Sequence, residues 1–400
     1  MRILKVVQSY YPFQEKGGTA VKVRALARGL AQRGHNLTVL TADLGFRSNN
    51  VSGLKVESCT LGWRAQEDQV EAIYLTTVGR YRSLSLNPRV AAFCRASLKE
   101  FDLVHFYGLY DLLAPAVSYF CRRNGIPYVI EPMGMYRPIV RSVPLKQLYH
   151  RILGRPLVGG ARFLIATSQL EKQELEESGI ASSRIVIRRN GVDLPERLPA
   201  RGEFRRQWGI RKDARIILFL GRLVSKKSPD LLLDAFAHWR GSASEKNDAV
   251  LVLAGPEEND GFGMSLRRMA HALGLDQNIR FVGPLYDDAK WQAYRDADVF
   301  VLPSQNENFG NTAAEAAGCG TPVIVTDQCG IASFIGQAGL VIPYGSRELV
   351  EALAQLLEDR EMRQRCQKAC AEMARALSWS DPLQQMEELY ERCLMKGIRR

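Results

Sequence analysis

Residues 297–327, "ADVFVLPSQNENFGNTAAEAAGCGTPVIVTD", hold two short apolar runs separated by a stretch of small residues. The runs "DVFVLPS" and "PVIVTD" are rich in β-branched residues and have the length of buried strands. Between them, "NTAAEAAG" is rich in alanine, the strongest helix former. A strand, a helix and a second strand in this order predict a βαβ unit, and therefore a parallel sheet.

The same alternation continues along the chain in both directions. Apolar runs that predict strands lie at 2–7, 36–42, 102–108, 127–132, 162–168, 184–190, 215–221, 249–255 and 279–283. Intervals that predict helices lie at 111–124, 169–179, 229–239, 262–273, 287–296 and 311–318, and the stretch 346–395 is almost purely helical.

The strand pattern restarts after a Pro- and charge-rich segment near residue 195. The sequence therefore predicts an α/β protein of two tandem, Rossmann-like, doubly wound domains, residues 1–193 and 194–376. Open sheets of this kind bind ligands beyond the carboxyl ends of their strands. Two such domains facing each other would form a cleft, so the residues that follow each strand are the ones to inspect.

Composition limits the possible partners. The net charge of +11 indicates an anionic partner, such as a phosphorylated small molecule, an anionic membrane or a nucleic acid. The charge is spread along the chain without a nucleic-acid-binding motif, which disfavours the last of these. Eight cysteines without CxxC or Cys/His clusters indicate reduced thiols in a cytosolic protein. The apolar N-terminus reads as a first strand rather than a signal peptide, and no apolar run reaches the ~20 residues of a membrane span.

Two loops after predicted strands carry phosphate-binding chemistry. Gly17 and Gly18 precede a helix, where backbone N–H groups can receive a phosphate; a simple tight turn is the alternative. Arg222 and Lys227 follow the strand at 215–221, where they could neutralise a diphosphate. Ordinary solvated loop charges are the alternative, and this is the interpretation we favour for Lys226.

The quoted stretch places two carboxylates around a predicted helix start. Glu307 precedes the helix at 311–318, and Glu315 lies about one turn inside it. A phosphate could sit on the helix N-terminus, with a ribose diol on Glu315 and sugar hydroxyls on Glu307. Glutamates are common on helices, so the pair by itself indicates little.

Several motifs of this chain, taken together, resemble those of the retaining glycosyltransferases of the GT4 type, which have the GT-B fold. They are "GRLVSKKSPDLLLDAF", "VLAGP", "IRFVGPL", the quoted stretch and "RRNGVD". The N-terminal "GG", "DLVHFYG" and "ATSQLEKQEL" fit the same family. The resemblance covers nearly the whole chain and is strongest from 215 to 345. It implies that residues 377–400 form a C-terminal helix that crosses back onto the N-terminal domain.

The resemblance also implies roles for individual residues. Arg222 and Lys227 match the diphosphate-binding pair, and Glu307 and Glu315 match the two glutamates of the family. The other matches are backbone contacts to donor sugar and phosphate, a backbone contact to the base, a loop near donor phosphate and acceptor, and an N-terminal histidine at the acceptor. The backbone contacts to donor sugar and phosphate fall on Phe309, Gly310, Asn311 and Thr312, and the contact to the base falls on Val282. The loop near donor phosphate and acceptor holds Gly17 and Gly18, and the histidine is His105.

Two positions depart from the family pattern. Tyr107 and Met133 stand where many relatives have histidine, so His105 is the histidine that is left in this N-terminal cluster. A histidine satisfied at a strand end is the alternative interpretation of His105. Asp296 and Asp298 form a D-x-D pattern, but it precedes a strand, and we interpret it as a helix end rather than a metal site.

The resemblance implies transfer of a hexose, with retention, from a UDP- or GDP-sugar to a glycan or a polyprenyl- or other lipid-linked acceptor. No cofactor or metal is expected. Cell-surface polysaccharide or glycolipid assembly in the cytoplasm, at the inner face of the membrane, would suit such an enzyme. A sugar-nucleotide epimerase and a non-catalytic nucleotide-sugar-binding protein are the alternatives. The basic, apolar stretch 136–160 could contact an anionic membrane, or could be a solvated helix packed on its domain.

Overall fold

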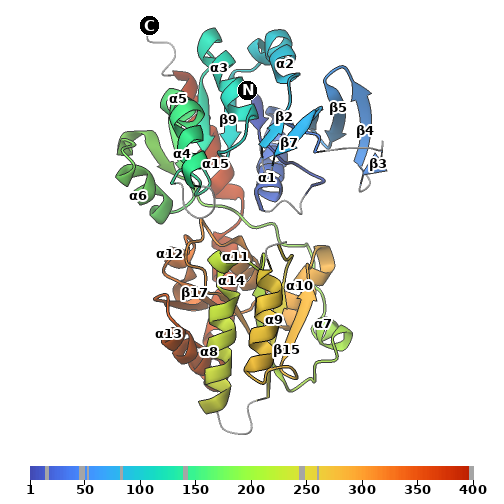
Figure 1. The fold of residues 1–400 in the computed structure, drawn as a ribbon, viewed down its shortest axis with the longest axis vertical. Helices are drawn as coiled ribbons and strands as arrows, with labels where there is room; N and C mark the ends of the chain where they lie inside the picture. Colours follow the sequence, from blue (N-terminus) through green and yellow to red (C-terminus); the bar gives the residue numbers. More distant parts are fainter. Residues whose placement is uncertain are drawn as a thin grey trace. The chain divides into compact units, whose positions relative to one another are not determined.

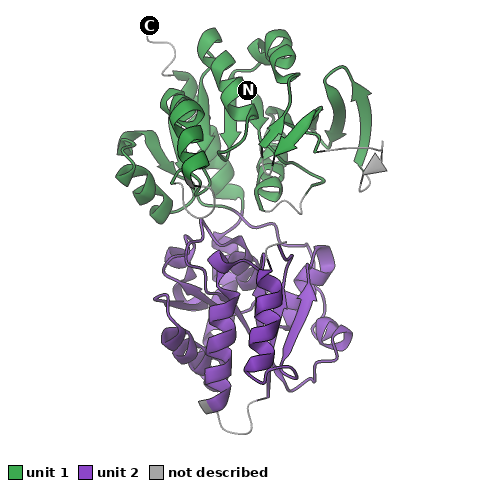
Figure 2. Ribbon diagram, in the orientation of Figure 1, with its two compact units in different colours: residues 1–190, 379–400 green, residues 191–378 purple. Residues whose placement is uncertain are grey.

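The computed structural model describes residues 1–13, 18–44, 50–51, 54–81, 84–137, 143–242, 248–258 and 261–395. The chain divides into two compact units, shown in Figure 2. The N-terminal unit consists of Met1–Asn190 together with Trp379–Arg400, and the C-terminal unit of Gly191–Ser378. Each is described by itself below.

The N-terminal unit contains a ten-stranded sheet in the order β12-β11-β10-β9-β1-β2-β6-β5-β4-β3. From β12 to β6 neighbouring strands are parallel, and the order reverses between β9 and β1. Its parallel strands are β1 (Arg2–Val6), β2 (Asn36–Ala42), β6 (Val70–Leu75), β9 (Leu103–Tyr107), β10 (Tyr128–Glu131), β11 (Phe163–Ala166) and β12 (Ile185–Ile187).

One edge of this sheet is antiparallel, which the βαβ pattern did not predict. β6 is followed outward by β5 (Gly62–Glu67), β4 (Leu54–Cys59) and β3 (Asn50–Val51), and β7 (Gly79–Tyr81) pairs with β8 (Leu84–Leu86) in a separate hairpin. Buried and exposed residues alternate at the start of β4, which is typical of a half-buried antiparallel strand.

Helices cover both faces of the N-terminal sheet. They are α1 (Gly18–Gln32), α2 (Val90–Ser97), α3 (Leu113–Asn124), α4 (Val143–Tyr149), α5 (Arg155–Gly160) and α6 (Gln169–Glu177), with a π-helical turn at His150–Gly154 joining α4 to α5. The last helix of the chain, α15 (Ser380–Met395), belongs to the same unit and contacts α1 (Figure 1). Its Leu383, Met386, Leu389 and Tyr390 are buried in the core on that face of the sheet.

The C-terminal unit has a fully parallel six-stranded sheet in the order β15-β14-β13-β16-β17-β18. The strands are β13 (Arg215–Leu220), β14 (Ala249–Ala254), β15 (Ile279–Gly283), β16 (Val299–Leu302), β17 (Val323–Thr326) and β18 (Gly339–Ile342). The order reverses between β13 and β16, which makes that point the topological switch where such sheets bind ligands.

The helices of this unit are α7 (Glu203–Gln207), α8 (Pro229–Ser242), α9 (Phe262–Ala272), α10 (Asp287–Asp296), α11 (Asn311–Gly318), α12 (Ala332–Ile335), α13 (Ser346–Glu358) and α14 (Arg360–Ala376). Apolar side chains from opposite faces of the strands fill two separate cores beneath them. The predicted fold class, two doubly wound α/β domains, is confirmed.

Candidate donor-binding site in the C-terminal unit

The switch point of the C-terminal sheet brings two of the predicted site residues into contact. β13 pairs with β16, so the loops that follow these strands are neighbours. Backbone contact joins them, because the Gln305 N–H donates to the Lys226 carbonyl at 3.0 Å. Lys227 Nζ then lies 2.8 Å from Glu307 Oε2, with both side chains about one-fifth exposed. A cation and a carboxylate thus share one partly open position.

The backbone around Glu307 is held by the loop after β17. Glu307 N–H donates to Gln328 O at 3.0 Å, and Gly330 N–H donates back to Glu307 O at 2.9 Å. These bonds form a short parallel bridge between Glu307 and Cys329. The Glu307 carboxylate therefore projects from a fixed backbone rather than from a free loop.

Gly310 shapes the entry to α11. Its φ of +110° is one that side-chain-bearing residues rarely adopt, and a Cβ there would lie 2.9 Å from Ile331 Cγ2. Phe309 is buried beside Phe334, and its carbonyl accepts from the Ile331 N–H at 2.6 Å. Glycine is thus required for the turn that points the start of α11 toward this edge of the sheet.

The first turn of α11 offers donors to an anion. Gly310, the residue before this helix, has no side chain with which to cap it, and the first N–H groups of any helix lack acceptors within it. Among the described residues, the buried Thr312 Oγ1 also has no hydrogen-bond partner. Gly310 and the first helical residues, Asn311 and Thr312, therefore offer neutral groups of the kind that can bind phosphate at a helix start.

Glu315 is oriented by two residues that the sequence did not single out. Lys290 Nζ lies 3.0 Å from its Oε1, and the Tyr294 hydroxyl donates to its Oε2 at 2.9 Å. Burial, together with the nearby Glu315 charge, raises the pKa of Tyr294 well above its ordinary value. The phenol therefore keeps its proton and stays a donor. Both partners lie on α10, and no motif marks a helix residue as the partner of a carboxylate on the next helix.

Arg222 follows β13 and pairs with a different carboxylate from the one that Lys227 contacts. Its side chain is exposed and lies 2.9 Å from Glu258, which follows β14. The two loops approach closely because position 255 is glycine: a Cβ there would lie 1.8 Å from Gly221 O. Val282 lies in β15, half-buried against the core of this unit.

The N-terminal candidates have different surroundings. Gly17 lies outside the described residues, and Gly18 is the exposed first residue of α1. His105 is fully buried within β9, with its Nδ1 2.7 Å from the Tyr390 hydroxyl and 3.0 Å from that of Tyr107. Lys5 in turn donates to Tyr107 at 2.6 Å. This burial favours the structural interpretation of His105 over an acceptor contact.

A buried ionic cluster surrounds that histidine. Glu131 pairs with Lys22 and, at 2.7 Å, with Arg188. Burial first, and then the positive charges of Lys5, Arg188 and Lys22, hold the pKa of His105 well below its ordinary value. The imidazole is therefore neutral, and it joins α15 to the sheet through Tyr390.

The D-x-D pattern is structural. Asp296 accepts from the N–H groups of Gly202 and Arg205 at 2.5 and 3.0 Å. Asp298 accepts from the Ile216 N–H at 2.9 Å and from the Arg205 guanidinium at 3.0 Å. Over the described part of the chain, no group of three or more His, Cys, Asp or Glu is placed to hold a metal ion.

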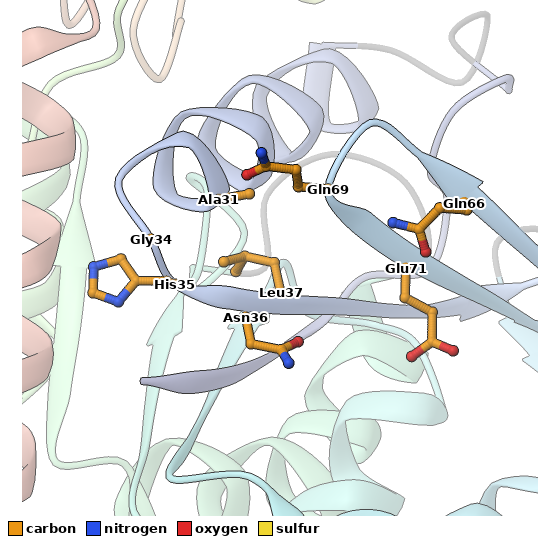
Figure 3. A pocket seen from close by; sticks show the side chains of 8 residues that line it. All are labelled: Ala31, Gly34, His35, Asn36, Leu37, Gln66, Gln69 and Glu71. Carbon is orange, nitrogen blue, oxygen red and sulfur yellow. The ribbon is translucent and has the colours of Figure 1, made fainter.

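A shallow hollow of about 520 Å³ lies elsewhere, on the N-terminal unit. Figure 3 shows His35, Asn36, Gln66 and Glu71 around it. It lies at Asn36, the start of β2, whereas sheets of this class bind ligands at the carboxyl ends of strands. None of the predicted site residues lines it, and we do not assign it to the site.

Two family models match this chain. The family described as "Glycosyl transferases group 1" matches residues 200–373, and "Glycosyl transferase 4-like domain" matches residues 17–191. The D-inositol 3-phosphate glycosyltransferase of Kribbella flavida is 30% identical over 390 residues, covering 91% of this chain and 88% of that protein. The protein of the same name from Thermomonospora curvata is 28% identical over 410 residues, covering 94% and 90%.

Solved structures share the fold. Anabaena HepE, determined with UDP and glucose, matches with a TM-score of 0.76 at 20% identity over 98% of this chain and 100% of HepE. Sucrose-phosphate synthase from Thermosynechococcus elongatus matches with a TM-score of 0.75 at 21% identity over 99% and 100%. With both family matches and a 30% identical relative along nearly its whole length, the chain belongs to the GT4-type glycosyltransferases of the GT-B fold.

Proposed function

We propose that this glycosyltransferase moves a hexose, with retention of anomeric configuration, from a nucleotide-diphosphate sugar to a hydroxyl of a glycan or lipid-linked acceptor. The observation that carries the proposal is the set of groups at the switch point of the C-terminal sheet. There Lys227 contacts Glu307, which stands just ahead of Gly310 and the start of α11. Cation, carboxylate and backbone donors match the diphosphate and hydroxyl groups of such a donor.

The charge of the leaving diphosphate gives a reason for Lys227 and Arg222 at this site. When the anomeric bond breaks, negative charge builds on the diphosphate oxygens. Lys227, Arg222 and the N-terminus of α11 would stabilise this charge, and a group of that kind typically contributes ~10²–10³ in rate. These residues would also do the work of a divalent metal, so we expect turnover to persist in EDTA.

Glu307 and Glu315 would bind the two ends of the donor. Carboxylates accept paired hydroxyl hydrogen bonds, which suits sugar hydroxyls at Glu307 and a ribose diol at Glu315. In the family, retention is usually ascribed to attack from the face that the diphosphate leaves. The departing phosphate can then take the acceptor proton, and no protein nucleophile is needed.

Similar proteins and the chemistry of the acceptor suggest which nucleotide and which acceptor this enzyme uses. HepE was solved with UDP and glucose, which supports UDP as one donor nucleotide, beside GDP. A lipid-linked acceptor would place the enzyme at the cytoplasmic face of a membrane. No helix among the described residues is long and apolar enough to cross a bilayer. A second candidate acceptor is a phosphorylated cyclitol, because the relatives are named D-inositol 3-phosphate glycosyltransferases.

The first experiment is a thermal-shift screen against UDP, GDP, ADP and their common sugar conjugates, with EDTA present. A ligand that binds only the folded state raises the melting temperature. We expect a clear shift with one nucleotide, followed by transfer assays with that nucleotide's sugars. Failure of every nucleotide to shift well-folded protein would contradict the proposal, and binding without transfer would favour the non-catalytic alternative. Interconversion of the sugar nucleotide would instead indicate an epimerase.

A further inference from the structure

The helical segment from Val143 to Gly160 presents an apolar face to solvent. It consists of α4, the π-helical turn and α5, which follow one another beside α3 in Figure 1. Leu145, Leu148 and Ile152 are 46%, 54% and 59% exposed. Their spacing of three and four residues places them along one side of a helix. Three large apolar side chains that share an exposed helical face are unusual, because such a stripe normally packs on a core.

The opposite side of this segment is firmly held by the N-terminal unit. Tyr149, Leu157 and Val158 are buried. The Tyr149 hydroxyl donates to the Asp111 carbonyl at 2.7 Å, and the Arg122 guanidinium donates to the Pro156 carbonyl at 3.1 Å. The exposed side is therefore fixed outward by packing, and it does not result from a loosely placed helix.

Positive charge borders the apolar face. Arg151 and Arg155 are exposed on the same segment, and no Asp or Glu occurs anywhere between Glu131 and Glu171. Six Arg or Lys residues fall in that interval. An apolar stripe beside cations, on a segment that itself contains no acidic residue, complements an anionic bilayer, where the apolar side chains enter the headgroup boundary and the cations meet lipid phosphates.

We propose that Leu145, Leu148 and Ile152, together with Arg151 and Arg155, form a docking face for the surface of an anionic phospholipid bilayer. This deepens the proposed function, since a lipid-linked acceptor is presented at such a surface. The docking itself needs neither donor nor turnover. It can therefore be tested separately from catalysis.

The test is co-sedimentation of the full chain with vesicles. Wild-type protein should bind phosphatidylcholine vesicles that contain phosphatidylglycerol, bind pure phosphatidylcholine much less, and be released by salt. Arg151→Glu with Arg155→Glu should weaken binding at least tenfold, because each basic residue near an anionic surface contributes about a fivefold factor. Leu145→Gln, Leu148→Gln and Ile152→Gln combined should weaken it by a similar or larger factor.

Matched controls lie on α9 of the other unit. Met264 is 65% exposed, and Arg268 is exposed on the same helix, so Met264→Gln with Arg268→Glu removes the same kinds of side chain elsewhere. This variant should bind vesicles like wild type. Unchanged melting temperatures would show that every variant is folded. The catalytic-site variant Lys227→Ala should also bind vesicles fully.

Three outcomes would overturn the docking face. They are absence of wild-type binding to anionic vesicles, equal loss in the α9 control, and a change of oligomeric state in the Gln variant without lipid, which would show that a second copy covers the face. If the protein transfers sugar to a water-soluble acceptor but does not bind vesicles, the docking face is refuted and the proposed function stands. If the protein binds vesicles but transfers sugar from no nucleotide sugar, the proposed function is refuted and the docking face stands.

Discussion

The Lys227 ammonium and the Glu307 carboxylate are 80 positions apart in sequence and 2.8 Å apart in the structure. The pairing of β13 with β16 accounts for this, because it makes neighbours of the loops that carry them. In this structure each group satisfies the other. In a donor complex, the same two groups would bind phosphate and sugar hydroxyls, so each holds the other in place at the site.

Lys227→Ala should lower kcat by ~10²–10³, because it removes positive charge from the leaving diphosphate. The fold should persist, since a partly exposed ion pair contributes little to stability. Steady-state kinetics with the donor found by thermal shift measure the effect. Lys226→Ala, on the adjacent residue, is the matched control and should stay close to wild type. Equal, near-normal rates in both variants would exclude Lys227 from catalysis.

Arg222→Ala should also lower kcat strongly, but the contact with Glu258 allows a sharper test. Glu258→Gln removes the charge that pairs with Arg222 and leaves the guanidinium in place. We expect this variant to keep its melting temperature, because exposed ion pairs contribute little to stability, about 0–1 kcal/mol. Its turnover should match or exceed that of wild type. If Glu258→Gln lost as much activity as Arg222→Ala, the pair itself, rather than Arg222 alone, would be the functional unit.

Tyr294→Phe should weaken donor binding while leaving kcat less affected. The hydroxyl orients Glu315, and removing one hydrogen bond to a charged group costs roughly 1.5–3 kcal/mol, or about ten- to a hundredfold in affinity. Glu315→Ala should weaken the same donor affinity at least as much. Isothermal titration with the nucleoside diphosphate separates binding from turnover. Donor affinity that is unchanged in Glu315→Ala would refute the ribose contact.

Gly310→Ala should lower the free energy of unfolding by about 2–4 kcal/mol, because the new Cβ meets Ile331 and φ is +110°. Donor affinity should fall as well, since the start of α11 must shift. Gly209→Ala is the control: φ is +61°, but a Cβ there meets open space, so a cost of roughly 1–2 kcal/mol is expected with normal donor affinity. Urea unfolding of both variants gives the comparison.

His105→Gln should make stability less sensitive to acid. The folded-state pKa of His105 lies below its unfolded value, so below about pH 6.5 the unfolded chain gains a proton that the folded chain does not. Unfolding free energy then falls with decreasing pH, by at most ~1.4 kcal/mol per unit from this group. Burial raises the pKa of Asp111 to about 6, which contributes with the opposite sign. The difference between wild type and variant therefore isolates His105.

The same variant separates the two interpretations of His105. If the residue is structural, folded His105→Gln should transfer sugar at a rate close to wild type, and Tyr390→Phe should loosen α15, seen as faster amide exchange in Ser380–Met395. A large loss of kcat in stable, folded His105→Gln would instead restore the catalytic interpretation.

The sequence by itself determined the repeating βαβ order, most of the parallel strands of both units and most of the helices after them, but it did not predict the parallel strands β6 and β18. Local hydrophobic periodicity carries this information: α10 and α11 begin and end at the predicted residues. It also determined which loops hold the candidate groups, because ligand chemistry in such sheets follows the carboxyl ends of strands. The antiparallel strands between Leu54 and Glu67 were not predicted, because short strands with alternating polarity carry a weaker signal than buried parallel strands.

Only the tertiary structure decided which of these groups meet. Strand order places Lys227 beside Glu307, and helix packing places Lys290 and Tyr294 on Glu315. The packing of the last helix on the N-terminal sheet also buries His105 against Tyr390, which no local sequence pattern indicates. The reason is physical: periodicity depends on neighbours within one turn or one strand, whereas burial and ion pairing depend on contacts between segments that are far apart in the chain.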